Sequence, residues 1–148
     1  LTELADCAPG VKAQTDDGLR RLMELHRDIG WRCHEMKHAR FEEGSEHFFA
    51  YTFEEVTGRT IAHGELVSLG VLVMSKFQGN NFEGAKDIIE KAGTRHRLED
   101  LGISTQEFLE SVKRTQSFSI EQKLWFSHAQ TIDFSKISDE AILESVNW

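Results

Sequence analysis

Two histidines sixteen positions apart are the residues of this chain best suited to chemistry. They occur in Gly44-Ser45-Glu46-His47 and in Ala62-His63-Gly64-Glu65, and each lies at or near the expected start of a helix. Imidazole is a common metal ligand near neutral pH. Two imidazoles that meet would supply half of a tetrahedral zinc site or a share of a non-haem iron site.

Spacing alone does not decide between a metal site and two structural histidines, because the pair lacks a compact local motif such as H-x-x-x-H. A helix over residues 45–57 is about 18 Å long, and a loop over residues 58–62 spans at most about 17 Å. If both histidines lie near helix starts, the loop must therefore run back beside the first helix. No carboxylate stands out by spacing as a third ligand. We interpret Glu46 and Glu65 as partners of the imidazoles or as charges that favour helix starts.

A second cluster comprises Cys33, His34 and His38. The two histidines are four residues apart, a spacing that would allow both to bind a metal on one helix face. The surrounding charges favour a solvated polar face instead. The chain has no G-x-S-x-G elbow, no P-loop and no G-x-G-x-x-G. Its catalytic residues therefore remain unknown, and we expect no nucleotide-binding residues in it.

Composition excludes several classes of protein. The 148 residues suit a single domain over residues 1–148. A net charge of −8 without a basic stripe argues against a nucleic-acid surface. The longest apolar stretch, Leu66–Met74, is too short to span a bilayer. Cys7 and Cys33 lie in no pairing motif, and no signal peptide is visible, so we expect free thiols in the cytoplasm, with one disulfide as the less favoured alternative.

The pattern of apolar residues predicts an all-α domain. No stretch shows sustained apolar–polar alternation, and glycines occur singly, like punctuation between helices. Boundary signals place the expected helices at 16–29 with Gly30 as a stop, 31–39, 45–58, 63 to about 78, 82–92, from 104, 120–129 and from 138.

Two of these helices have a distinctive composition. The helix after His63 is apolar nearly all round, which places it at the centre of its domain. Gly64 and Gly70 would allow another backbone to approach it closely. In the helix before it, we expect the aromatic residues Phe48, Phe49, Tyr51 and Phe53 to belong to the core rather than to a cofactor site.

The two histidine motifs resemble those of a known enzyme family. Gly-Ser-Glu-His, followed by His-Gly-Glu-x-Val-x-x-Gly up to Gly70, looks like the metal-binding region of the glycerol-1-phosphate dehydrogenases. That family belongs to a group with glycerol dehydrogenase, iron-containing alcohol dehydrogenases and dehydroquinate synthase. The stretch Leu98–Ile103, followed by a helix from Ser104, is similar to the group's C-terminal half. The resemblance covers roughly residues 15–140.

The resemblance implies a helical metal-binding domain like the C-terminal half of dehydroquinate synthase-like enzymes. It implies that His47 and His63 are metal ligands, with Zn²⁺ preferred over Fe²⁺. The family's remaining acidic ligand and its NAD(P)-binding domain would precede Leu1. We therefore expect the parent protein to act on a polyol phosphate with NAD(P), and this chain to be inactive alone. Tyr51 stands where several family members have another histidine.

The sequence leaves two alternatives open. The phrase Glu54–Gly58 ahead of His63 is also similar to the dehydroquinate synthase branch, which implies a sugar-phosphate cyclase. The other alternative is a non-enzymatic helical interaction module in which both histidines are structural. The oligomeric state is open as well, with a homo-oligomer among the possibilities.

Overall fold

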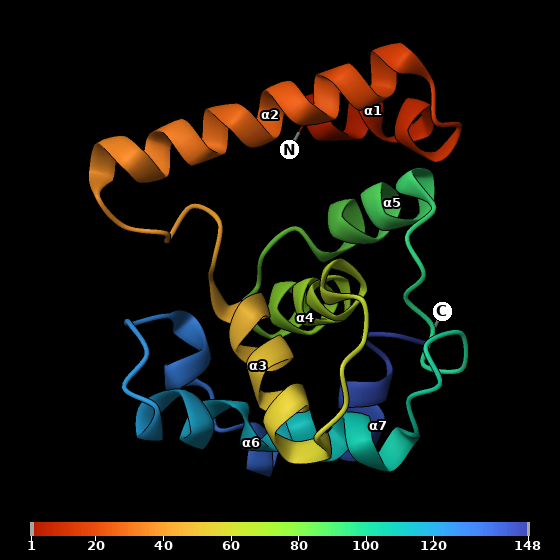
Figure 1. The fold of residues 1–148 in the computed structure, drawn as a ribbon. Coiled ribbons are helices and arrows are strands. Elements are labelled where there is room, and N and C mark those ends of the chain that lie inside the picture. The colour runs from red at the N-terminus through yellow and green to blue at the C-terminus, as the bar shows by residue number, and fades with distance from the viewer. Residues whose placement is uncertain (1, 148) are drawn as a thin grey trace. The chain divides into compact units, whose positions relative to one another are not determined.

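The computed structural model describes residues 2–147, which form helices and contain no β-strand. The expectation of an all-α fold is therefore confirmed for this part of the chain. The elements are α1 (Thr2–Lys12), α2 (Asp16–Met36), α3 (Ser45–Thr57), α4 (His63–Phe77), α5 (Phe82–Ala92), α6 (Thr105–Glu121), the 3-10 helices η1 (His128–Thr131) and η2 (Phe134–Lys136), and α7 (Asp139–Leu143) (Figure 1). None of these helices is both long enough and apolar enough to cross a membrane.

The chain divides into two compact units. The first comprises the chain up to Gly44 together with Glu83–Thr94, and the second comprises Ser45–Phe82 and the chain from Arg95 onward. The first unit thus holds α1, α2 and nearly all of α5, and the second holds the remaining helices. His34 and His38 belong to the first unit, whereas His47 and His63 belong to the second.

Helix α2 differs from its prediction in the first unit. It continues through Gly30 and ends at Met36, so the predicted stop at Gly30 and the separate helix over 31–39 are wrong. A glycine inside a helix costs only about 1 kcal/mol relative to alanine, and it does not end a helix by itself. The helix ends instead at Lys37, which adopts a left-handed conformation with φ 57°.

The second unit is built around α3, which packs against both α4 and α6. Ser45 begins α3 as predicted, and Gly58 follows its end with φ +63°. The helix after His63 was predicted to be central, but α3 takes that place, and α4 packs against it with several fully buried side chains. The largest fully buried side chains of these three helices are Phe48, Phe49, Phe53, Leu66, Leu69, Leu72, Val73, Phe108 and Val112.

In the C-terminal part of this unit, the predicted helix starts at residues 104 and 138 are confirmed. One of the predicted helices is absent from the described residues. Ser104 caps α6 with a complete capping box, and Ser138 caps α7 through the amide of Ala141. The helix predicted over 120–129 is wrong, because α6 ends at Glu121 and Lys123 adopts a left-handed conformation. The chain then re-forms only a 3-10 turn at η1. Cys7 and Cys33 are free thiols, as expected.

Candidate metal centre

The structure brings His47 and His63 together. His47 lies in the first turn of α3, and His63 is the first residue of α4. Their ring centroids are 5.2 Å apart, with an angle of 49° between the ring planes. The segment after α3 runs back along that helix to the start of α4 (Figure 1), as the short loop requires. The geometric condition for a shared site is therefore met.

A glycine sets the close crossing of α3 and α4. A Cβ atom added to Gly70 would lie 2.3 Å from the carbonyl oxygen of Glu46, so only glycine allows this approach. His63 lies seven residues before Gly70, which is about 10 Å along α4. The crossing therefore places the first turns of α4 beside the start of α3. The prediction of a close backbone approach is confirmed at Gly70 and wrong at Gly64, where an added Cβ would meet nothing within 4 Å.

The start of α3 is itself anchored by its first residue. Ser45 is buried, and its hydroxyl is hydrogen-bonded to the hydroxyl of Ser127. The same oxygen accepts the backbone N–H of Ala129 at 3.1 Å. These contacts tie the first turn of α3, which carries His47, to the segment that leads into η1.

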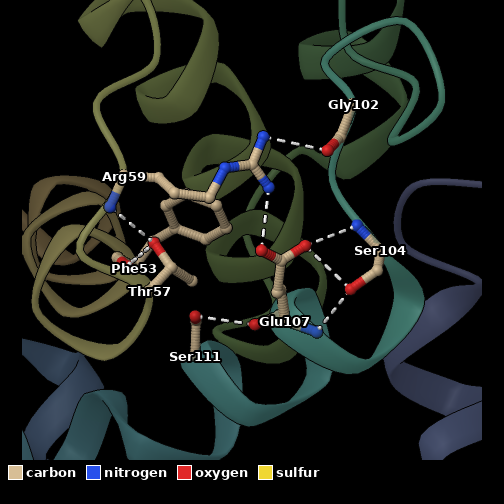
Figure 2. A network of polar contacts seen from close by, with 7 residues as sticks. All are labelled: Phe53, Thr57, Arg59, Gly102, Ser104, Glu107 and Ser111. Carbon is tan, nitrogen blue, oxygen red and sulfur yellow. Dashed lines mark hydrogen bonds and ion pairs between the residues drawn. The ribbon is translucent and has the colours of Figure 1, made fainter.

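An arginine holds the returning loop in place (Figure 2). Arg59 donates from Nη1 to Oε1 of Glu107 at 2.8 Å and from Nη2 to the carbonyl oxygen of Gly102 at 2.9 Å. Its backbone N–H donates to the hydroxyl of Thr57. The loop that delivers His63 is thus bound to the start of α6. Sequence reasoning missed Arg59, because its partners lie more than forty residues away.

Glu107 serves two structural roles at once. While Oε1 accepts from Arg59, Oε2 accepts from both the backbone N–H and the hydroxyl of Ser104, each at 2.8 Å. The hydrogen bond from Arg59, followed by those from Ser104, lowers the pKa of Glu107 from its ordinary 4.5 to about 2. The carboxylate is therefore ionised throughout the neutral range, where it both caps α6 and holds the loop.

A carboxylate also orients His47. The ring donates from Nδ1 to Oε1 of Glu46 at 2.9 Å, and both side chains are largely buried. With the proton held at Nδ1, the lone pair of Nε2 is the one that a metal would take. This contact confirms Glu46 as a partner of the imidazole. Glu65 does not play that part for His63, because both of its oxygens accept from Arg95.

Tyr51 is the third ring of this cluster. Its centroid lies 6.1 Å from that of His47 and 6.4 Å from that of His63, and it is nearly parallel to the second ring. The expected core role holds for the fully buried Phe48, Phe49 and Phe53 but is wrong for the half-buried Tyr51. The available signal was its spacing of four residues from His47, which places both side chains on one face of a helix.

Comparison with curated proteins finds enzymes of known activity. The glycerol-1-phosphate dehydrogenase [NAD(P)+] of Saccharolobus solfataricus is 31% identical over 106 residues, which are 72% of this chain and 30% of that enzyme. The enzyme of the same name from Methanosarcina barkeri is 23% identical over 119 residues, which are 80% of this chain and 33% of that enzyme. The chain is a distant relative of the glycerol-1-phosphate dehydrogenases. It spans about a third of the length of these relatives. No protein-family model matches the chain.

The two histidines of this glycerol-1-phosphate dehydrogenase relative suit a shared cation. Rings that bind one zinc ion tetrahedrally at about 2.0 Å have centres about 5 Å apart, close to the observed separation. The donor set within residues 2–147 is partial, however. No group of three or more His, Cys, Asp and Glu side chains in that range is placed to hold a metal ion. Two imidazoles alone are fewer than the three protein ligands that a catalytic zinc ion usually takes.

The cluster at Cys33 does not form a comparable pair in this relative of the dehydrogenases. Helix α2 ends between His34 and His38, so the two residues do not share a helix face. The ring of His34 lies against Trp31, and that of His38 stacks on Phe41. His38 also accepts the backbone N–H of Arg40 at Nδ1. The two histidines are therefore not paired with each other, and the exposed Trp31 and Phe41 make the expected polar surface partly apolar.

Proposed function

We propose that this chain is the helical metal-binding domain of an NAD(P)-dependent dehydrogenase that acts on a polyol phosphate such as glycerol 1-phosphate. His47 and His63 are two ligands of a divalent cation, with Zn²⁺ as the first choice and Fe²⁺ as the alternative. The observation that carries the proposal is the approach of these two imidazoles to 5.2 Å from positions sixteen residues apart. The named relatives support the reaction class and the NAD(P) requirement.

The chain's own residues would prepare this site in a simple way. Glu46 keeps the proton of His47 on Nδ1 and leaves Nε2 to bind. Two neutral imidazoles do not offset the positive charge of the cation. Only the other ligands could reduce it. When bound, a divalent cation supplies Lewis acidity that lowers the pKa of an alcohol and prepares it to lose hydride to a nicotinamide.

We also propose that the 148 residues alone do not catalyse the reaction. The chain spans about a third of the length of its relatives, and its described residues build helices only. Recognition of the nicotinamide cofactor and completion of the ligand set would then fall to other parts of the full enzyme. A purified 148-residue chain that oxidised glycerol 1-phosphate with NAD(P)⁺ would overturn this part of the proposal.

Zinc binding by the metal-free chain tests the proposed site. A competition titration with a chromophoric chelator should find one zinc site in the unaltered chain. His47→Ala and His63→Ala should each weaken zinc binding by at least about tenfold. The matched control is the double variant His34→Ala with His38→Ala, which should bind zinc like the unaltered chain. Equal affinity in the His47 and His63 variants would contradict the proposal.

A further inference from the structure

The two imidazoles of the candidate site are held in different ways. His47 is largely buried and hydrogen-bonded to Glu46. His63 is exposed, and within residues 2–147 its ring has no hydrogen-bond partner. The ring nevertheless lies beside His47 rather than extending into solvent. Its neighbours are two other rings, those of His47 and Tyr51.

Tyr51 is placed to restrict the ring of His63. The two ring planes differ by 24° and their centroids are 6.4 Å apart, which is within the range of offset aromatic pairs. Side chains in a helix lean toward its N-terminus, so Tyr51 leans from the middle of α3 toward His47 and the start of α4. The neighbouring Ala50 and Thr52 are fully buried, so the backbone that carries Tyr51 is firmly placed.

We propose that Tyr51 is a positioning residue that holds the ring of His63 beside His47 by its aromatic face. For His63, the stacked ring does what the carboxylate of Glu46 does for His47. It limits the rotamers of an exposed side chain before any ligand arrives. The consequence for metal binding rests on the proposed function, whereas the ordering of the ring does not.

Side-chain NMR of the metal-free chain tests the ordering directly. Tyr51→Phe keeps the aromatic face and should leave the order of the His63 ring unchanged. Tyr51→Leu removes the face and should make the ring markedly more mobile. Trp31→Leu, which removes the aromatic neighbour of His34, is the matched control and should not affect His63. A His63 ring that is equally ordered in the unaltered chain and in Tyr51→Leu would overturn the proposal.

Zinc titration of the same variants separates this proposal from the metal site itself. Tyr51→Leu should weaken zinc binding about three- to tenfold, and Tyr51→Phe should change it by less than about twofold. If Tyr51→Phe weakens binding as much as Tyr51→Leu does, the hydroxyl and not the face is responsible, and the proposal fails. If substitution of His47 and of His63 leaves zinc binding unchanged, the proposed function fails. The NMR result still decides the role of Tyr51.

Discussion

The two histidine pairs of this chain show opposite relations between spacing and structure. His34 and His38 are four residues apart, the spacing that places two side chains on one helix face, yet a helix end separates them. His47 and His63 are sixteen residues apart in no local motif, yet their rings meet. Local spacing is informative only while the helix continues. A remote pair depends instead on how two helices cross and how the loop between them is held.

Specific contacts explain why His34 and His38 are separated while His47 and His63 meet. In the first unit, Lys37 turns the chain into the left-handed region and His38 leaves the helix, where Phe41 stacks on it. In the second unit, Gly70 allows α4 to lie against the backbone of Glu46. Arg59 then ties the connecting loop to α6. The meeting of His47 and His63 should therefore be sensitive to changes at positions that touch neither ring.

The largest effect is expected from Gly70→Ala. The new methyl group would lie 2.3 Å from the carbonyl oxygen of Glu46, so α4 must move away from α3. Overpacking of this kind costs about 1–3 kcal/mol. Hydrogen exchange of the α3 and α4 amides, read by mass spectrometry, should show faster opening of both helices. Zinc binding should weaken as well, because the two rings separate.

Gly64→Ala is the matched control in the same helix. An added Cβ at this position meets nothing within 4 Å, and alanine favours a helix by up to about 1 kcal/mol over glycine. Exchange in α4 should therefore slow or stay the same, and zinc binding should persist. If both alanine variants behaved alike, the crossing at Gly70 would not be what joins the histidines.

A smaller effect is expected from Glu107→Gln, which loosens the loop that carries Arg59. Near neutral pH, the backbone amides of the loop and of the first turn of α6 should exchange hydrogen about two- to fivefold faster in the variant. This factor matches the loss of a partly exposed ion pair. Because folding lowers the pKa of Glu107 to about 2, the unfolded state binds more protons between pH 4.5 and pH 2. The stability that this carboxylate supplies is therefore present above pH 4.5 and is lost as the pH falls toward 2.

Unfolding midpoints measured across that pH range should show the two proteins converging. The difference between the unaltered chain and Glu107→Gln should be constant above pH 4.5 and vanish near pH 2. Glu110→Gln, at an exposed position of the same helix, serves as the control and should differ little from the unaltered chain at any pH. A gap between the Glu107 variant and the unaltered chain that persisted near pH 2 would show that charge is not the cause.

Sequence alone predicted the parts of the fold that have local signals. Ser104 and Glu107 form a capping box where a helix was expected to begin, and Gly58 and Gly93 follow the expected helix ends with positive φ. The sequence did not predict α1, and two errors in the later helices arise where a residue type was given too much weight. Gly30 did not stop α2, and the apolar residues after Ile120 did not make a helix, since Lys123 turns the chain there.

The two histidines of the candidate site could be predicted from the sequence, but the residues that hold them in place could not. The resemblance of the two motifs singled out His47 and His63, and the short loop required a return path. Arg59 and Tyr51 were not found, since one acts through residues of α6 and the other resembles its buried aromatic neighbours. Such contacts depend on the packing of three helices, which no local pattern encodes.

The most direct test of the central claim is ¹⁵N NMR of the imidazole rings while zinc is added to the metal-free chain. We predict that Nε2 of His47 and one ring nitrogen of His63 shift together with the same stoichiometry. Nδ1 of His47 should keep its proton, held by Glu46, and the rings of His34 and His38 should not change. Zinc-dependent shifts at His34 and His38, with His47 and His63 unaffected, would contradict the account.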